Sequence, residues 1–288
     1  PISRLALATA QNRLAEKGLF DELAIPVAPY RAVDSLESLK QAVAELGLPI
    51  VLKTVTGGYD GKGQFVLRSE DQIDTAWAEL GPAKSLIAES FVKFSREVSI
   101  IAVRGQDGDV KTWALAENHH HNGILSHSIV PAPNSTDLQP VAQDYITRLL
   151  NHLSYVGVLT LELFVTEQGL YANEMACRVH NSGHWSIEGA ICSQFENHIR
   201  AVAGLPLGAT DVVRPAVMVN IIGQHPKSED VLALKGAHLH LYNKSERAGR
   251  KLGHITLMPN NSDELTDLCR QLAQILPVPL ALTTDMNI

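Results

Sequence analysis

Residues 158–174 read Val-Leu-Thr-Leu-Glu-Leu-Phe-Val-Thr-Glu-Gln-Gly-Leu-Tyr-Ala-Asn-Glu, and this stretch decides the fold. Its two ends have the composition of β-strands, rich in branched and aromatic residues, and they flank a turn that contains glycine. We expect Glu167–Gly169 to form a three-residue loop with glycine in the left-handed conformation, which pairs Thr166 with Leu170. The stretch therefore predicts an antiparallel hairpin.

Counting inward from that pair, the hairpin places Glu162 opposite Glu174 on the same side of the ladder. Like charges directly opposite each other on a sheet repel, so the two carboxylates favour a cation between them. Oxygen ligands without cysteine or a close histidine favour magnesium, which keeps waters and shares phosphate oxygens. The hairpin thus predicts a metal–nucleotide site. The alternative is two solvated glutamates on a hairpin of different register.

The composition indicates a globular protein with one large domain or two to three small ones. The 288 residues are 45% hydrophobic and 19% charged, and the net charge of −7 argues against a general affinity for nucleic acid or anionic membranes. No apolar stretch is long enough to span a bilayer, and no signal peptide is visible. Cys177, Cys192 and Cys269 are too few and too scattered for a disulfide framework, so we expect a cytoplasmic protein.

A second landmark is the glycine-rich segment Lys53–Gln64, Lys-Thr-Val-Thr-Gly-Gly-Tyr-Asp-Gly-Lys-Gly-Gln, between two predicted strands. Glycines let backbone N–H groups approach a polyphosphate, and lysines add positive charge. The segment is not a P-loop, because Thr56 and Gly63 stand where that motif requires glycine and a hydroxyl residue. We expect a glycine-rich hairpin that folds over phosphates. A plain β-turn at Asp60-Gly61 is the alternative.

Three other polar strings are candidate sites. Arg178–His184, Arg-Val-His-Asn-Ser-Gly-His, precedes a predicted helix and suits an anion, although a helix-capping loop is the alternative. Lys244–Lys251 is basic enough for a monophosphate, but such strings are more often solvated turns. Adjacent residues of a strand point to opposite faces, so His119–His121 do not bind one metal ion together, and His120 is the member expected to line a site.

The remaining pattern interleaves helices and strands without a strict βαβ repeat, which favours an α+β fold with mixed or antiparallel sheets. We expect one helical segment over Ser3–Leu23, then an alternating unit over Val33–Ser90, then a larger unit. Helices are predicted near Leu138–His152, Ser186–Val202 and Ser262–Ile275. Further strands are predicted at Ile50–Lys53, Gln64–Leu67, Ser85–Glu89, Arg96–Val103, Val110–Glu117, Ala216–Ile222, Ala237–Tyr242 and His254–Leu257.

Together these motifs resemble the ATP-grasp family, and within it the N5-carboxyaminoimidazole ribonucleotide synthetases of purine biosynthesis. Gly57–Gln64 and Arg178–Trp185 carry most of the resemblance, together with Asn173-Glu174 and Gly249–His254. The resemblance covers essentially the whole chain, and it implies that the family's N-terminal Rossmann-like domain is missing. The implied fold is an ATP-grasp fold, with a small α/β lid subdomain, a larger mixed or antiparallel sheet subdomain and a small C-terminal β-rich domain.

The resemblance also implies domain boundaries. A linking helix would occupy residues 1–27, and the lid subdomain with its glycine-rich loop would occupy residues 28–90. The catalytic subdomain would span residues 91–215, and the C-terminal domain residues 216–288.

The implied activity is that of an ATP-dependent carbon–nitrogen ligase with ATP and Mg²⁺ as cofactors. ATP would phosphorylate bicarbonate to carboxyphosphate, and the amine of 5-aminoimidazole ribonucleotide would capture the carboxyl group, directly or as carbon dioxide. N5-carboxyaminoimidazole ribonucleotide, ADP and phosphate would result. Two alternatives stay open: another ATP-grasp ligase, such as a formate-dependent phosphoribosylglycinamide formyltransferase, and a non-catalytic nucleotide-binding module. Dimers are common in the family, so the resemblance also admits a homodimer.

Roles for individual residues follow from the same resemblance. The residues that would bind ATP are Arg13, Lys53, Gly58, Tyr59, Asp60, Gly61, Lys62, Gly63, Gln64, Glu89, Ser90, Phe91, Val92, Glu97, His120, Asn173 and Glu174. The residues that would bind the ribonucleotide are Tyr59, Asp60, Lys62, Lys244, Arg250 and Lys251. The implied catalytic residues are Arg178, His180, Asn181 and Lys62, of which the first three would position bicarbonate. Glu162 and Glu174 would hold magnesium, and Cys177 stands where the relatives have proline.

Overall fold

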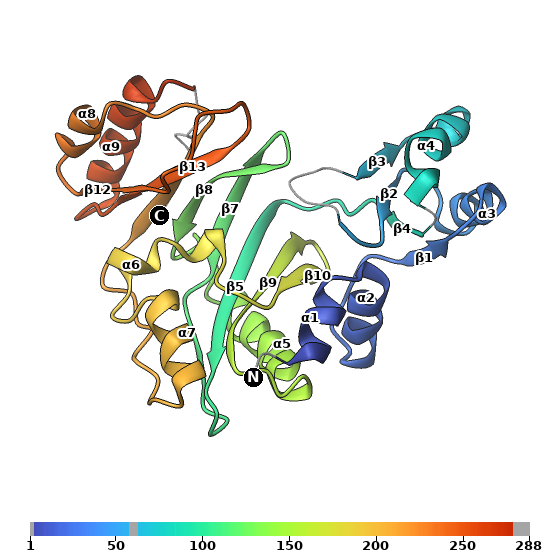
Figure 1. Ribbon diagram of the computed structural model, residues 1–288, viewed down its shortest axis with the longest axis horizontal. Helices are drawn as coiled ribbons and strands as arrows, with labels where there is room; N and C mark the ends of the chain where they lie inside the picture. The colour runs from blue at the N-terminus through green and yellow to red at the C-terminus, as the bar shows by residue number, and fades with distance from the viewer. Residues whose placement is uncertain (1–2, 58–62, 84, 279–288) are drawn as a thin grey trace.

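The structure is a computed structural model that describes residues 3–57, 63–83 and 85–278. Over this part of the chain the strands form two sheets. Within each sheet, every ladder between neighbouring strands is antiparallel. In Figure 1 the smaller sheet lies at one side with α3 and α4, and the larger sheet runs through the centre. Antiparallel sheets combined with helices confirm the predicted α+β class.

The smaller sheet corresponds to the alternating unit that the sequence predicted. Its strand order is β1-β4-β2-β3, and α3 and α4 pack against it and against each other. Leu39 of α3 and Ile50 of β2 are fully buried between these layers. Ser35 and Ser38 form a capping box that fixes the start of α3. The elements are β1 (Tyr30–Val33), α3 (Leu36–Leu46), β2 (Ile50–Thr54), β3 (Gln64–Leu67), η1 (Glu70–Gln72), α4 (Ile73–Leu80), η2 (Gly81–Ala83) and β4 (Leu86–Ser90).

The larger sheet contains nine strands within the described residues, in the order β10-β9-β5-β7-β8-β11-β13-β12, with β6 paired to β5. Because β11 pairs with both β8 and β13, the sheet continues without a break into the C-terminal part of the chain. The strands are β5 (Arg96–Arg104), β6 (Val110–Thr112), β7 (Ala116–His121), β8 (Ile124–Val130), β9 (Gly157–Thr166), β10 (Gly169–Ala176), β11 (Ala216–Ile222), β12 (Ala237–Leu241) and β13 (Lys251–Leu257).

Helices cover the larger sheet and its outer strand β10. Both α1 and α2 contact β10, α5 packs on β5, β9 and β10, and α9 packs on β13 (Figure 1). No helix in the described part is long and apolar enough to cross a membrane. The helices are α1 (Arg4–Ala10), α2 (Arg13–Glu22), α5 (Leu138–His152), η3 (Asn181–Gly183), α6 (Ser186–Gly189), α7 (Gln194–Ala203), α8 (Ser228–Leu232) and α9 (Ser262–Ile275).

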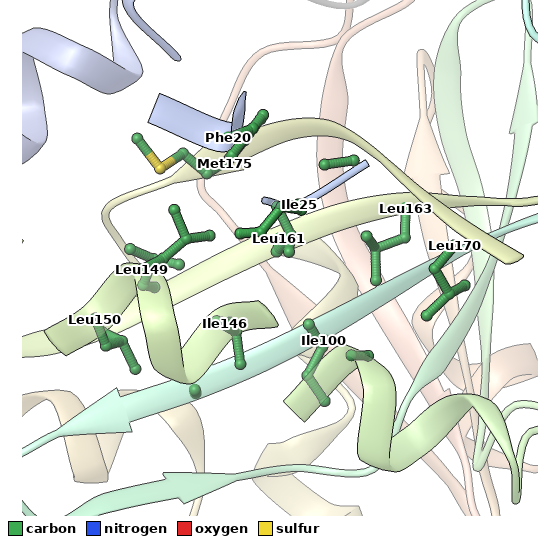
Figure 2. Close-up of a cluster of buried hydrophobic side chains, with 14 of the residues drawn as sticks. Phe20, Ile25, Ile100, Ile146, Leu149, Leu150, Leu161, Leu163, Leu170 and Met175 are labelled. Atoms are coloured by element: carbon green, nitrogen blue, oxygen red, sulfur yellow. The ribbon is translucent and has the colours of Figure 1, made fainter. Parts of the chain in front are cut away.

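The β9–β10 hairpin buries one of its faces against α5. Figure 2 shows Leu161, Leu163 and Met175 of the hairpin in the same cluster as Ile146 and Leu149 of α5. Each fully buried side chain of this size contributes roughly 1.5–3 kcal/mol, so this face fixes the position of the hairpin. Strict alternation along β9 then directs the intervening residues to the opposite face.

Two predicted helices are each interrupted in the structure. The segment Ser3–Leu23 forms α1 and α2, because the Asn12 side chain accepts the first N–H groups of α2 and starts a new helix. The segment Ser186–Val202 forms α6 and α7, and Ser193 caps the second of these. In both cases a polar residue inside an apolar repeat competes with the helix for its backbone donors.

The predicted strand Val110–Glu117 is also divided. Its first part forms β6, whereas its last residues belong to β7, which continues through the three histidines. Sequence analysis did not predict β8, whose serines and histidine weaken its strand-like composition although Ser126, His127 and Ser128 are buried. Strand propensity largely reflects how a side chain packs on its neighbours, and here the neighbouring strands β7 and β11 supply that packing.

Candidate active site

The hairpin places Glu162 directly opposite Glu174, as the sequence predicted. The predicted loop was nevertheless wrong. Thr166 pairs with Gly169 and not with Leu170, so two residues, not three, form the turn. That register alone would leave Glu174 one place out of line with Glu162.

A β-bulge between Ala172 and Glu174 restores the alignment, with Asn173 as the extra residue. The bulge changes which face the following side chains use, so Glu174 lies on the face of Glu162 while Met175 enters the core. Counting residues from the turn cannot reveal such an insertion. The prediction made the turn one residue too long and omitted the one-residue bulge, and these two errors cancelled.

Each carboxylate of this pair has a cationic or polar partner. Oε1 of Glu162 lies 2.9 Å from Nε2 of His180, and Oε2 of Glu174 lies 3.1 Å from a guanidinium nitrogen of Arg13. Burial alone would raise the pKa of Glu162, but the hydrogen bond from His180 holds it below the usual value. Glu162 is therefore ionised at neutral pH.

The hydrogen bonds around His180 determine which of its nitrogens carries the proton. The backbone N–H of Ser182 donates to Nδ1 at 3.3 Å, so Nδ1 is an acceptor and the proton is on Nε2. The Ser182 hydroxyl lies 2.8 Å from the same nitrogen and 2.8 Å from the hydroxyl of Ser99. The buried Gln194 side chain bonds both backbone groups of His180. His180 thus presents an N–H group to Glu162.

Glu97 and His120 form a second acidic–basic contact, on β5 and β7. Nδ1 of His120 lies 3.3 Å from Oε1 of Glu97. Burial opposes protonation of His120, but the hydrogen bond and charge of Glu97 outweigh it and raise the pKa of the imidazole. His119 instead stacks on His127 with ring centroids 4.3 Å apart.

A buried ion-pair cluster joins α2 to the smaller sheet. Oε2 of Glu89 lies 3.0 Å from Nζ of Lys53 and 3.5 Å from Nζ of Lys17. Burial would raise the pKa of Glu89, but the two ammonium groups hold it below its usual value. No group among the described residues hydrogen-bonds Oε1 of Glu89, which is buried. That orphaned acceptor fits a bound group with an N–H or O–H donor, as a nucleotide base has.

The segment after Glu89 leads from the smaller sheet into the larger one. Its Ser90 and Phe91 N–H groups donate to the carbonyls of Pro29 and Pro49, at 2.8 and 3.1 Å. An adenine ring held by this backbone would therefore use the carbonyl oxygens or Val92.

The polar segment Arg178–His184, which follows the hairpin, contacts residues of the C-terminal strands and the loop after β12. The amide groups of Asn181 and Asn220 bond each other in both directions, at 2.9 and 2.8 Å. Nδ1 of His184 lies 2.9 Å from the Tyr242 hydroxyl, which lies 2.7 Å from Nδ1 of His254. Arg178 is exposed, and its guanidinium donates to the carbonyl of Val179.

The predicted phosphate-binding string lies near the acidic pair. Lys251 is close enough to lower the pKa of Glu162 by its charge. Nζ of Lys244 lies 5.2 Å above the ring of Tyr242 and 3.4 Å from the carbonyl of Lys251. Arg250 donates to the hydroxyl of Ser245 at 3.0 Å. The fold therefore brings residues about 90 positions apart to one site.

The glycine-rich segment is only partly described. Gly58, Tyr59, Asp60, Gly61 and Lys62 lie outside the described residues. The segment joins β2 to β3, which pair antiparallel with Lys53 opposite Gln64, and Gly63 has a φ of +70°. The two strands predicted on either side of the segment therefore form an antiparallel pair, and the closure of the segment over phosphates stays a prediction.

Two carboxylates and no third protein ligand suit magnesium. Among residues 3–57, 63–83 and 85–278, no group of three or more His, Cys, Asp or Glu side chains could hold a metal ion. Magnesium is usually bound through one or two carboxylates and completed by waters and substrate phosphates. The opposed Glu162 and Glu174 therefore fit magnesium delivered with a nucleotide.

Cys177 has no features of a nucleophile. Burial raises the pKa of its thiol to about 12, and its carbonyl accepts a 2.9 Å hydrogen bond from the Tyr155 hydroxyl. The Tyr155 hydroxyl thus holds the backbone just after β10, and the thiol stays protonated at neutral pH.

Comparisons with known proteins agree with this geometry. The model of the ATP-grasp domain matches residues 18–195, and the model of the phosphoribosylaminoimidazole carboxylase C-terminal domain matches residues 216–267. The N5-carboxyaminoimidazole ribonucleotide synthase of Pseudomonas aeruginosa is 50% identical over 252 residues, which cover 88% of this chain and 69% of the relative. The chain belongs to this family of ATP-grasp proteins.

Solved structures of the synthase family have the same fold. The synthetase from Thermus thermophilus is 47% identical and superimposes with a TM-score of 0.90, covering 95% of this chain and 74% of that one. The synthase from Aspergillus clavatus, in complex with ADP and 5-aminoimidazole ribonucleotide, is 30% identical with a TM-score of 0.86, covering 94% and 74%. The ATP-grasp fold with an additional C-terminal unit is thereby confirmed.

Two residues that contact the acidic hairpin, Glu16 and Lys17, were not predicted from the sequence. Glu16 and Lys17 of α2 both have an exposed fraction of only 2%. Burial raises the pKa of Glu16 to about 8. The signal that was available is their helical spacing, three or four residues before the buried Leu19 and Phe20, which places them on the same face of α2.

Proposed function

We propose that the chain catalyses the ATP- and bicarbonate-dependent carboxylation of 5-aminoimidazole ribonucleotide to N5-carboxyaminoimidazole ribonucleotide, releasing ADP and phosphate. The observation that carries the proposal is the pair Glu162 and Glu174, flanked by His180 and Arg13 at hydrogen-bonding distance. Relatives that are 44–50% identical are synthases of this product, and one related structure holds ADP with the same ribonucleotide.

The nucleotide would lie between the two sheets. Lys53 and Arg13 would contact its phosphates, Glu97 its ribose, and Glu89 to Val92 its base. His120, which lies 3.3 Å from Glu97, would occupy another position of the nucleotide site. The glycine-rich segment between β2 and β3 would cover the phosphates and exclude water. Glu162 and Glu174 would hold magnesium, with Asn173 nearby, and the ion would neutralise charge on the transferred phosphoryl group.

Bicarbonate is a weak electrophile, so its phosphorylation precedes attack by the amine. Arg178, His180 and Asn181 would position bicarbonate and carboxyphosphate. The position of His180 beside the acidic pair supports this role, because its Nε2 lies 2.9 Å from Oε1 of Glu162. The ribonucleotide would be held through its 5′-phosphate by Lys244, Arg250 and Lys251, and through Tyr59, Asp60 and Lys62.

We also propose a cytoplasmic location, because all three cysteines are free thiols, as is usual in a reducing compartment. A homodimer is proposed from the family resemblance alone.

The test is release of ADP by this chain with magnesium–ATP and bicarbonate, with and without 5-aminoimidazole ribonucleotide. We expect turnover that depends on bicarbonate and is stimulated by the ribonucleotide. Stimulation by formate with phosphoribosylglycinamide would favour the formyltransferase alternative. Binding of ATP without substrate-dependent ADP release would favour a nucleotide-binding module.

A further inference from the structure

Strand β10 is the outer strand of the larger sheet, so no strand of the described residues pairs with one row of its backbone groups. Residues at the N-terminal end of the chain occupy that row. The Ala172 N–H donates to the carbonyl of Pro26 at 2.7 Å, and the Met175 N–H donates to Oε1 of Glu16 at 2.6 Å. The two groups flank the bulge from either side.

The carbonyls of the bulge itself accept from a single ammonium group. Nζ of Lys17 lies 2.8 Å from the carbonyl oxygen of Asn173 and 3.3 Å from that of Ala172. The Lys17 side chain is 2% exposed, so these bonds are made away from bulk water. Charge-assisted hydrogen bonds of this kind are stronger than neutral ones.

The bulge determines where the carboxylate of Glu174 points. In a regular ladder with Asn173 included, Asn173 would face Glu162 and Glu174 would turn toward the core face that Met175 now occupies. A group that stabilises the bulge therefore stabilises the opposition of the two carboxylates.

The same ammonium also reaches the smaller sheet. Its third partner is Oε2 of Glu89 at 3.5 Å, the carboxylate oxygen that binds Lys53. Lys17 thus connects the bulge beside Glu174 with the strand β4 that leads into the predicted adenine site.

We propose that Lys17 is a positioning residue, which fixes the bulge at Asn173 and thereby keeps Glu174 opposite Glu162 for metal binding. The inference rests on the proposed magnesium site. Lys17 would act through the backbone carbonyls of the bulge and not as a ligand of the metal. Its substitution should weaken the metal site specifically, whereas a purely structural lysine would change only the free energy of unfolding.

The test compares Lys17→Met with Lys111→Met in the full chain. Lys111 is a matched control, because its ammonium also donates to a backbone carbonyl, that of Leu207 at 3.2 Å, but on the distant strand β6. Binding of Mn²⁺ in the presence of ADP, followed by electron paramagnetic resonance, gives a readout that does not require turnover. Hydrogen exchange of the β10 amides reports on the bulge.

For Lys17→Met we expect Mn²⁺ affinity to fall by about 10-fold or more, as for other residues that orient metal ligands, and the β10 amides to exchange faster. Lys111→Met should retain the wild-type affinity. Wild-type affinity in a folded Lys17→Met protein would overturn the inference. If that variant does not fold, Lys17→Gln is measured instead. Its side chain is one bond shorter and its donor is uncharged, so the same loss of Mn²⁺ affinity is expected, and wild-type affinity would again overturn the inference.

A Glu174→Gln variant separates this inference from the proposed function. Weaker Mn²⁺ binding in Glu174→Gln with unchanged binding in Lys17→Met would overturn the role of Lys17 and leave the metal site intact. Unchanged binding in Glu174→Gln would overturn the metal site itself, and the role of Lys17 would fall with it.

Discussion

The two sides of the acidic pair are built by opposite electrostatic means. On the side of α2 and the smaller sheet, Glu89 is charged and is compensated by Lys17 and Lys53. On the C-terminal side, burial lowers the pKa values of His184 and His254 to about 3, so both rings are neutral at pH 7.

The difference has a physical consequence. Paired charges in a buried site have already lost their hydration, so removing one leaves the others uncompensated. Neutral rings joined through the Tyr242 hydroxyl carry no such penalty until a proton is added. The first side is therefore sensitive to substitution, and the second is sensitive to acid.

The largest effect should come from the pair between the two sides. We expect Glu174→Gln to reduce ATP turnover by at least about 100-fold, because magnesium loses a charged ligand. The fold should persist, since the side chain is 45% exposed. The measurement is ADP release, with circular dichroism as a check on folding and Glu167→Gln, in the exposed hairpin turn, as the control. Activity near that of the wild type would contradict the metal assignment.

The charged side can be tested through its carboxylate. Glu89→Gln leaves Lys17 and Lys53 without their shared counter-ion, so we expect a loss of about 3–5 kcal/mol in the free energy of unfolding. Urea denaturation measures this loss. The control is Glu196→Gln, which breaks an exposed pair with Arg200 and should cost less than about 1 kcal/mol. Similar losses in both variants would show that the charges on this side are not mutually dependent.

The neutral side can be tested with pH. The folded pKa of His254, about 3, lies below the usual histidine value of 6.5, so the unfolded chain binds the proton first. Stability contributed by the neutral ring is present above pH 6.5 and is lost as the pH falls toward 3, at about 1.4 kcal/mol per pKa unit.

We therefore expect His254→Gln to reduce the loss of unfolding free energy between pH 7.5 and pH 5. The reduction should be about 1.4 kcal/mol or more, the energy of one pKa unit, and urea denaturation at each pH measures it. An unchanged slope would contradict the assignment of a neutral buried His254. Glu89→Gln should leave this slope in place, because its pairs belong to the other side.

The smallest effect concerns the exposed basic string. Lys244→Ala should raise the Michaelis constant for the ribonucleotide about 10-fold, the value of one charge-assisted contact, and change that for ATP much less. Lys227→Ala, an exposed lysine before α8, is the control. Equal effects on both substrates would argue against a phosphate contact by Lys244.

Sequence patterns predicted the hairpin because two segments of strand-like composition flank a turn that contains glycine. They did not predict the bulge at Asn173, which depends on backbone partners supplied by α2. The opposition of Glu162 and Glu174 was predicted only because the errors in turn length and register cancelled.

Burial was the other quantity that local pattern could not give. Lys17 is a common surface residue type, and only the packing of α2 against β10 and the smaller sheet encloses it. The family resemblance supplied roles for Lys53, Glu97 and His120 but not for the groups that hold them. Those supports come from tertiary contacts between distant segments.

The continuity of the larger sheet limits how the chain can be shortened. A truncation after residue 215 would remove β11, and β8 would lose its partner over Ala216–Val219. The freed edge would present buried residues such as Ile129 and Val130 beside unpaired backbone groups. Such an edge is a template for intermolecular strand pairing, so the truncated protein should aggregate instead of retaining a smaller nucleotide-binding unit.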